Sequence, residues 1–270
     1  MALHIVDRGS GTPIVVIPGV QGRWEWMRPA IDALAGSCRV VTFSLADEPS
    51  SGATFDEGRG FWSYVDQVRD ALDIAGLNRA AICGVSYGGL IAAAFAARYP
   101  DRTACLVLVS ALPPSWKPDA RVGFYVRSPR LLTPLFLVGS LRLYSEIAAA
   151  SSGATASVGA ALSHAWRALT HMFSPSRMAR RVRLLESIDL NKELTQLAVR
   201  TLVVTGEPSL DRVVPVGATL EYARLWPHTV MATIAHTGHL GFITRPKDFA
   251  RVLVSFVEDA AQLDMRRHVG

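Results

Sequence analysis

The sequence predicts an α/β fold in which helices cover both faces of a mostly parallel β-sheet. Short apolar runs alternate along the chain with segments whose apolar residues recur at helical spacing, and this alternation is typical of strand–helix–strand units. The runs are apolar at almost every position, as expected for strands that are buried on both faces. Half of the 270 residues are hydrophobic, which is enough for one large core with an insertion.

The elements follow one another in a regular order before and after a central interruption. Apolar runs rich in β-branched residues predict strands, and helical spacing, with one segment ending near Gly76, predicts helices. The predicted strands are PIVVIPG (13–19), CRVVTFSL (38–45), AAICGVS (80–86), TACLVLVSAL (103–112), VRTLVVTGE (199–207) and TVMATIAH (229–236). The predicted helices are 26–36, 61–77, 90–99, 216–226 and 246–260.

The interruption begins after Pro113-Pro114, where the strands stop and the apolar spacing becomes helical. No linker of the kind that separates independent domains precedes or follows it. We therefore expect one core formed by residues 1–111 and 196–270, with residues 112–195 inserted as a helical cap.

Charge and cysteine usage exclude several classes of protein. The net charge is +5, but residues 115–190 hold ten Lys/Arg against four Asp/Glu, so the rest of the chain is nearly neutral. With no zinc-finger, RNA-recognition or helix-turn-helix motif, no nucleic-acid partner is expected. The three cysteines, Cys38, Cys83 and Cys105, lack metal spacing and suit core packing, so no metal is expected.

The N-terminus shows no basic segment followed by an apolar stretch, so no signal peptide is visible. The most apolar window, residues 131–141, is too short to span a bilayer and contains Pro134. A cytoplasmic location is the expectation.

A glycine-rich turn, CGVSYGG (83–89), joins a predicted strand to a predicted helix. Ser86 stands where a dinucleotide-binding G-x-G-x-x-G turn needs its second glycine, and the Lys of a phosphate-binding P-loop is missing. The pattern G-x-S-x-G instead predicts a strained turn that exposes the Ser86 Oγ as a nucleophile. Gly84 and Gly88 must lack side chains, because Cβ atoms there would collide with neighbouring backbone.

A serine nucleophile needs a base, and the base needs a carboxylate that orients it. In chains with this turn the order is Ser, acid, His. The segment EPSLDRVVP offers Asp211, with Glu207 as a rival that could instead brace the loop. The segment IAHTGHLGF offers His239, whereas His236 is nearer the strand and better suited to a structural hydrogen bond. We predict that Asp211 and His239 are the partners of Ser86.

The order and spacing of four segments resemble those of α/β-hydrolase-fold proteins, in particular the serine hydrolases of this fold that have a helical cap. The four segments are VVIPGVQG, CGVSYGGLIAAAFAARYPDRTACLVLVSA, LVVTGEPSLDRVVP and TIAHTGHLGFITRPKDFARVLVSFV. The resemblance covers nearly the whole chain except the cap. It implies a mostly parallel sheet flanked by helices, a cap inserted after the sixth strand, and the roles of nucleophile for Ser86, acid for Asp211 and base for His239.

The resemblance also implies an oxyanion hole made by two backbone N–H groups, those of Val20 and Tyr87. Family members usually carry His-Gly in the loop after the first of the strands predicted here, and this chain has Pro18-Gly19. Proline cannot copy the loop-bracing hydrogen bond of that His side chain. The donors themselves are backbone groups, so the hole can survive the change.

A serine nucleophile favours acyl chemistry over the dehalogenases and epoxide hydrolases of this fold, which use Asp. We expect a carboxylesterase-like enzyme without a cofactor, acting on a small or medium apolar ester or a related acyl substrate. A carbon–carbon bond hydrolase, which tends to have Asn where this chain has Val85, or an acyltransferase is the alternative. Aminopeptidases of the fold need acids in the cap, which is acid-poor here. A ligand-binding receptor with a slow or vestigial triad is the alternative of another class.

Apolar side chains beside the oxyanion loop and in the cap are candidates for the substrate pocket, with ordinary packing as the alternative for each. They are Trp24, Trp26, Leu135, Phe136 and Trp166.

Two charged segments, one acidic and one basic, are not part of the predicted catalytic residues. The acidic stretch ADEPSSGATFDEGRG (46–60) has no recognised metal-loop spacing and is interpreted as a solvated loop. The arginines at 177, 180, 181 and 183 could attract an anionic substrate or a membrane surface, but a solvated helix face is the simpler interpretation. A monomer or a homodimer is expected.

Overall fold

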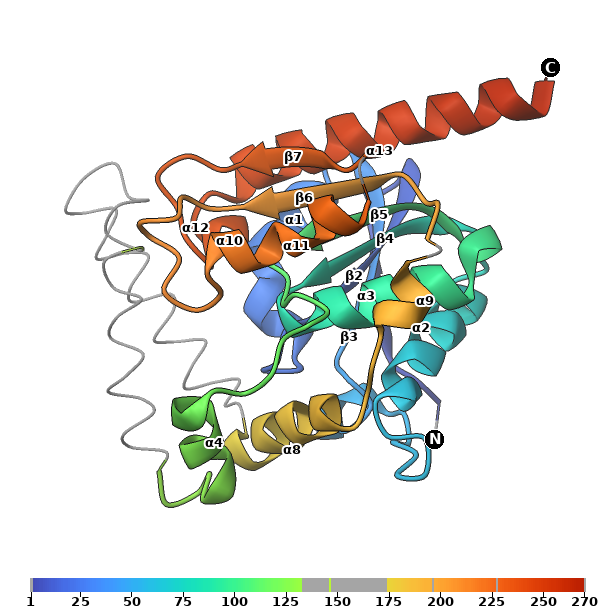
Figure 1. The fold of residues 1–270 in the computed structure, drawn as a ribbon. Coiled ribbons are helices and arrows are strands. Elements are labelled where there is room, and N and C mark those ends of the chain that lie inside the picture. The colour runs from blue at the N-terminus through green and yellow to red at the C-terminus, as the bar shows by residue number, and fades with distance from the viewer. Residues whose placement is uncertain (1, 133–145, 147–173, 196, 227, 270) are drawn as a thin grey trace.

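The computed structural model describes residues 2–132, 146, 174–195, 197–226 and 228–269 (Figure 1). The described strands are β1 (Ile5–Arg8), β2 (Thr12–Ile17), β3 (Cys38–Phe43), β4 (Ala80–Val85), β5 (Thr103–Val109), β6 (Thr201–Thr205) and β7 (Val230–Thr233). The longer helices are α1 (Arg28–Leu34), α2 (Trp62–Ile74), α3 (Tyr87–Arg98), α4 (Ala120–Arg127), α8 (Pro175–Glu186) and α13 (Pro246–Val269). The short helical turns are η1 (Trp24–Met27), η2 (Pro49–Ser51), η3 (Pro100–Arg102), α9 (Asn191–Leu194), α10 (Val216–Thr219), α11 (Glu221–Leu225) and α12 (Gly241–Thr244).

The described strands form one sheet in the order β1-β3-β2-β4-β5-β6-β7. All neighbours are parallel except β1 and β3, which confirms the predicted mostly parallel sheet. The edge strand β1 was not predicted, because its sequence IVDR is short and half polar. The described insertion follows β5, the fifth of the described strands, whereas the resemblance implied an insertion after the sixth strand of the family's fold.

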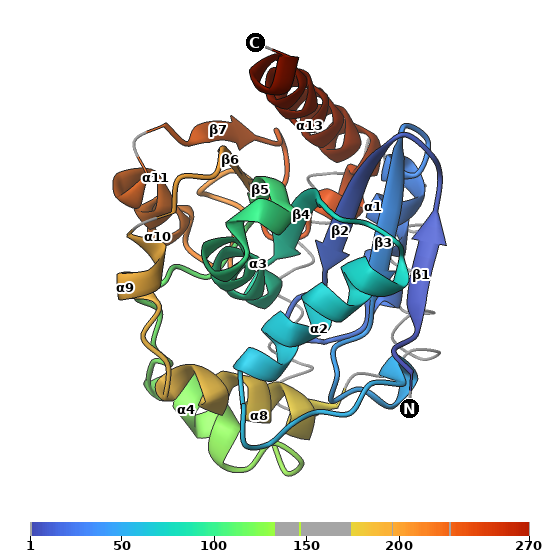
Figure 2. The same cartoon turned by 90° about the vertical axis from the view of Figure 1, so that its right-hand side faces the viewer.

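Helices cover both faces of the sheet, as the apolar strands predicted (Figure 2). On one face α1 and α13 pack against each other, and α13 also packs on β5. On the other face α3 lies along β4 and β5, with α2 beside it. Because both faces are covered, every residue of the central strand β4 is buried. None of the described helices is both long and apolar enough to cross a membrane.

The two longer described helices of the insertion lie on the side of the sheet that α2 and α3 cover (Figures 1 and 2), and Arg181 of α8 contacts the chain after β2 and after β3. There α4 and α8 pack side by side (Figures 1 and 2). Each begins with a side-chain cap, since Asp119 accepts from the Val122 N–H and Ser174 from the Arg177 N–H. The last turn, α9, packs on α3 of the core, and Trp226 donates to the Leu194 carbonyl over 2.8 Å.

The strand-to-helix turn at Ser86 has the strained backbone that its glycines predicted. Ser86 has φ 52° and ψ −116°, in the positive-φ region that L-residues rarely adopt. A Cβ at Gly84 would lie 2.2 Å from the Gly88 carbonyl oxygen, and a Cβ at Gly88 would lie 2.5 Å from the Pro18 carbonyl oxygen. Both predicted collisions are therefore confirmed, and they show how closely α3 approaches β4 and the end of β2.

Replacing Gly84 with alanine is expected to lower the free energy of unfolding by about 1–3 kcal/mol, because the added methyl group meets fixed backbone. The matched control is Gly123→Ala in α4, where a Cβ would meet no atom within 4 Å. Alanine there should be neutral or stabilise the helix by about 0.5–1 kcal/mol. Urea unfolding of both variants tests the prediction, which fails if they share one midpoint.

Candidate active site

The predicted nucleophile, Ser86, lies at the carboxyl end of β4 and directly precedes α3. Its backbone N–H donates to the Val109 carbonyl of β5 over 2.9 Å, and its own carbonyl accepts from Gly89 over 2.9 Å. The turn is thus tied to the sheet on one side and to the helix on the other. Because α3 begins at Tyr87, the positive end of its dipole faces the serine, where it favours negative charge.

The structure brings His239 and Asp211 together. The Nδ1 of His239 lies 3.5 Å from Oδ2 of Asp211, within ion-pair distance but longer than a good hydrogen bond. The other oxygen of Asp211 accepts the Val213 and Val214 N–H groups, each over 2.9 Å. Burial alone would raise the pKa of Asp211, but His239 and these two N–H groups outweigh it and lower that pKa. Asp211 is therefore held as a carboxylate facing the imidazole.

A glycine allows the two loops to meet. A Cβ at Gly238 would lie 2.5 Å from the Leu210 carbonyl and 2.7 Å from the Asp211 nitrogen. Only glycine therefore lets the backbone before His239 lie directly on the backbone before Asp211. Ser86, Asp211 and His239 are 8%, 8% and 7% exposed, so all three are largely withdrawn from water.

The rival residues brace the histidine loop. The Glu207 carboxylate accepts the His236 backbone N–H over 2.7 Å, and the Glu207 N–H donates to the Thr237 carbonyl over 2.7 Å. His236 itself is mostly exposed and has φ 59°, which this contact holds in place. Glu207 thus has the loop-bracing contact that the sequence offered as its alternative role.

The two predicted oxyanion donors lie beside the nucleophile. A Cβ at Gly19 would lie 3.5 Å from Cβ of Ser86, which places the loop after β2 against the serine turn. Tyr87 begins α3, where the first N–H groups of a helix have no partner within it. Within the described residues, neither the Val20 nor the Tyr87 N–H donates to a backbone carbonyl of a turn or loop.

The predicted pocket residues divide into two groups. Trp24 packs against the core between the sheet and α1 and α13, and the guanidinium of Arg8 lies over its ring. Trp26 is half-buried in η1. Leu135, Phe136 and Trp166 lie outside the described residues.

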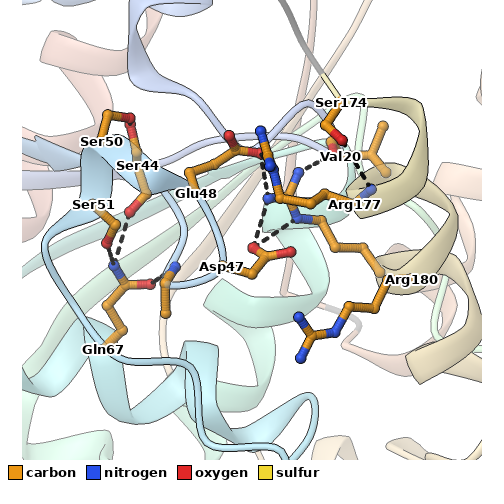
Figure 3. Close-up of polar contacts among 12 residues, drawn as sticks. Val20, Ser44, Asp47, Glu48, Ser50, Ser51, Gln67, Ser174, Arg177 and Arg180 are labelled. Carbon is orange, nitrogen blue, oxygen red and sulfur yellow. Dashed lines mark hydrogen bonds and ion pairs between the residues drawn. The ribbon is translucent and has the colours of Figure 1, made fainter.

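The interpretation of residues 46–60 as a solvated loop is wrong for its first two acids. The side chains of Asp47 and Glu48, both labelled in Figure 3, are buried, and both accept hydrogen bonds from Arg181 of α8, which is also buried. Arg181 therefore does not belong to a solvated helix face. The acidic and basic segments looked solvated when taken separately, whereas in the structure they neutralise each other. The complementary charges were the sequence signal for this contact.

The outer members of the two segments remain closer to solvent. Arg177 donates to Glu48 over 3.1 Å, while Arg180 pairs with the exposed Glu57 and lies over the ring of Phe55. Arg183 donates to the Val126 carbonyl of α4. Among the described residues, no cluster of three or more His, Cys, Asp or Glu side chains could hold a metal ion.

One buried acid of the insertion, Glu146, was not predicted from the sequence. One of its oxygens accepts the Gly238 N–H over 2.9 Å and also the Leu240 N–H, the two N–H groups that flank His239. Burial raises the pKa of Glu146, and the two N–H groups and His239 only partly offset this effect. Glu146 is the only Asp or Glu between Asp119 and Glu186, and this isolation was the signal available.

Fold and site together define the class of protein. The chain belongs to the alpha/beta hydrolase fold family, whose model matches residues 12–246, and it is a hydrolase of that family. Over 264 residues it is 26% identical to the 2-hydroxy-6-oxo-2,4-heptadienoate hydrolase of Pseudomonas putida, with 94% of this chain and 92% of that protein covered.

Solved structures share the fold. An esterase from Exiguobacterium antarcticum superposes with a TM-score of 0.79 at 19% identity, covering 95% of each chain. The enol-lactonase from Burkholderia xenovorans LB400 gives a TM-score of 0.74 at 20% identity, covering 95% of this chain and 96% of that one.

Proposed function

We propose that the protein is a serine hydrolase that acts on a small or medium apolar ester through an acyl-enzyme on Ser86. The single observation that carries the proposal is the buried Asp211–His239 pair on the loops after β6 and β7, strands that run parallel to β4, whose carboxyl end carries the strained turn at Ser86. In this proposal His239 takes the proton of the Ser86 hydroxyl while Oγ attacks the ester carbonyl. The carbonyl π electrons move onto oxygen, and the Val20 and Tyr87 N–H groups stabilise the oxyanion.

The second half of the reaction reuses the same groups. The tetrahedral intermediate collapses, the bond to the alcohol breaks, and His239 gives its proton to the leaving oxygen. Water then attacks the acyl-enzyme with His239 again as base, and the acid and free serine are released. Asp211 stabilises the imidazolium in both steps and stays ionised, which its lowered pKa supports.

The pairing of the cap arginines supports an uncharged substrate. Arg177, Arg180 and Arg181 all pair with acids of the same chain, so their charges are already neutralised without a ligand. An apolar acyl group suits such a site better than an anion.

A second candidate is hydrolysis of a carbon–carbon bond in an oxo acid. The relative from Pseudomonas putida, named for a 2-hydroxy-6-oxo-2,4-heptadienoate, favours it, because the match covers almost the whole of both chains. Against it stands Val85 before the serine, where the family's carbon–carbon hydrolases tend to have Asn. Parallel assays with p-nitrophenyl esters and a 2-hydroxy-6-oxo dienoate would separate the two activities.

The test of the proposal uses a fluorophosphonate probe and p-nitrophenyl esters of increasing chain length, on wild type and Ser86→Ala. We expect the probe to label Ser86 in the wild type only, and a burst of p-nitrophenol where deacylation limits the rate. A wild type that is neither labelled nor faster than Ser86→Ala on any ester would exclude the enzyme and favour a receptor.

A further inference from the structure

The loop that carries Val20 lacks the brace that members of its family usually have. Pro18 has no side-chain donor and no N–H, so residue 18 cannot donate a hydrogen bond that would hold the loop. Yet the direction of the Val20 N–H decides whether it can stabilise an oxyanion. Some other contact must fix the peptide groups on either side of Val20.

Two hydrogen bonds hold those peptide groups. The Gly22 N–H donates to the Gly19 carbonyl over 2.9 Å, and Nη1 of Arg181 donates to the Val20 carbonyl over 2.7 Å. The Gly19 carbonyl and the Val20 N–H share one planar trans peptide, so holding that carbonyl on one side directs the N–H to the other. Arg181 holds the next peptide, and the loop is fixed on both sides of Val20.

The guanidinium fits the inside of this loop. A Cβ at Gly22 would lie 2.3 Å from Nη1 of Arg181, and Gly22 has φ 77°, so a side chain at this position would displace the guanidinium. The Gly22 carbonyl accepts the Leu45 N–H over 2.7 Å, which ties the loop to the segment that carries Asp47. The loop is therefore enclosed between Arg181 and the chain after β3.

Arg181 is held in turn by two buried carboxylates, those of Asp47 and Glu48, which are labelled in Figure 3. Its Nη2 lies 2.6 Å from Oδ1 of Asp47 and 2.7 Å from Oε1 of Glu48, and its Nε lies 3.1 Å from the same Asp47 oxygen. The three side chains are 0%, 1% and 0% exposed. Burial disfavours the charged guanidinium, but the carboxylates outweigh it and raise the pKa of Arg181. The arginine is thus a fixed, permanently charged donor.

This arrangement is costly as a means of stabilising the fold. Among the described residues, the second oxygen of each carboxylate, Oδ2 of Asp47 and Oε2 of Glu48, is buried and has no hydrogen-bond partner. A buried ion cluster with unsatisfied atoms is often no better for stability than apolar residues of the same size. What the cluster does provide is a fixed geometry. The two carboxylates hold the side chain of Arg181 in one position, with Nη1 directed at the Val20 carbonyl.

The second predicted oxyanion donor, Tyr87, packs in the part of the core that lies near Arg181. The ring of Tyr87 is fully buried and meets the rings of Phe61 and Tyr64 edge-on, with centroids 6.2 Å apart in each case. The charges of Arg181 and Asp47 act directly on Tyr64. Val20 therefore contacts the Arg181 cluster, defined as Arg181, Asp47 and Glu48, directly, and Tyr87 is linked to it through the ring of Tyr64.

We propose that Arg181, a residue of the cap, is the positioning residue of the oxyanion hole, which it sets by holding the Val20 carbonyl. The proposal rests on the proposed function, since it assigns Arg181 a part in the same acyl chemistry. Arg181 does not touch the substrate; it acts through the loop after β2.

Two variants test the bracing, and neither leaves a buried carboxylate of the cluster without a positive partner. Arg181→Lys keeps one positive charge but loses the second donor arm that reaches Val20. The triple variant Arg181→Met, Asp47→Asn, Glu48→Gln removes every charge of the cluster, so that no carboxylate is left buried and unpaired. The matched control is Arg183→Met, which removes an arginine of the same helix that also donates to a backbone carbonyl, that of Val126 over 2.9 Å.

Three measurements are made on variants shown to be folded by thermal unfolding: kcat and KM for a p-nitrophenyl ester, the rate of labelling by a fluorophosphonate, and the affinity for a trifluoromethyl ketone. The ketone forms a tetrahedral adduct whose oxyanion occupies the hole. We expect kcat, labelling rate and ketone affinity to fall together by about 10- to 100-fold, with KM within about twofold, because only transition-state binding is lost. A cluster that merely stabilises the fold would not change ketone affinity in folded protein.

The outcomes separate the two proposals. If wild type is labelled at Ser86 and both cluster variants match Arg183→Met in kcat and ketone affinity, the bracing role is overturned and the serine hydrolase stands. If wild type itself is not labelled and cleaves no ester, the proposed function is overturned and the bracing role with it.

Discussion

Replacing Asp211 with asparagine is expected to lower kcat by about 10³- to 10⁴-fold while KM changes little. The asparagine would keep much of the shape and one acceptor oxygen, but it would remove the negative charge that stabilises the imidazolium of His239. It would also present an NH₂ group toward Nδ1, which favours the wrong tautomer for a base. Steady-state kinetics on a p-nitrophenyl ester measure the effect.

The control for this variant is Asp70→Asn, which neutralises an exposed acid of α2 paired with Arg69 and should keep wild-type kcat. A loss smaller than about tenfold in Asp211→Asn would argue that Asp211 does not support the base.

The same variant should also change how stability depends on pH. The pKa of Asp211 is lowered in the folded protein, so its ionisation contributes stability that is fully present above the unfolded pKa of about 4. That contribution is lost as pH falls through the folded pKa. The stability difference between wild type and Asp211→Asn should therefore shrink from about pH 5 downward, as urea unfolding at several pH values would measure.

Replacing Glu146 with leucine is expected to cost about 2–6 kcal/mol of stability and most of the activity. The leucine would leave the Gly238 and Leu240 N–H groups without their acceptor, and each buried donor left unpaired costs about 1–3 kcal/mol. Because these groups flank His239, the loop carrying the base should loosen. Glu146→Gln, whose amide oxygen can accept both hydrogen bonds, should keep most of the activity.

The glutamine variant also reports the charge of Glu146. Burial raises the pKa of Glu146, so its contribution to stability is fully present below the unfolded value and is lost as pH rises through the folded pKa. Glutamine cannot ionise and escapes that loss. The stability of Glu146→Gln relative to wild type should therefore increase from about pH 4 upward, and a difference that is flat with pH would contradict an ionising Glu146.

Local constraints explain why much of this molecule could be predicted from its sequence. The turn at Ser86 depends on glycines within a few residues, and the strands on apolar runs, so both could be read directly. The meeting of Asp211 and His239 followed from the order of strands in a parallel sheet. The strand β1 was not predicted because it has only four residues, two of them polar, which is too few to show the apolar pattern of a strand.

Long-range charge pairing could not be predicted in the same way. Arg181 is separated from Asp47 by 134 positions and Glu146 from Gly238 by 92. Complementary charge and isolation single these residues out, but nothing in the local segments specifies which residues they pair with. Taken alone, each charged segment favours solvent. The residues that connect the insertion to the predicted site were therefore visible only in three dimensions.

The buried contact between α8 and the chain after β3 has a consequence for engineering. Caps are natural parts to exchange between relatives when a new substrate range is wanted. In this protein the donor cap would have to bring its own arginine to the place of Arg181. Without it, Asp47 and Glu48 would remain as two like charges away from water, at a cost of about 3–5 kcal/mol or more. The inserted segment is thus not an interchangeable module, and a successful chimera would have to supply this arginine or carry over the matching acidic segment of the core.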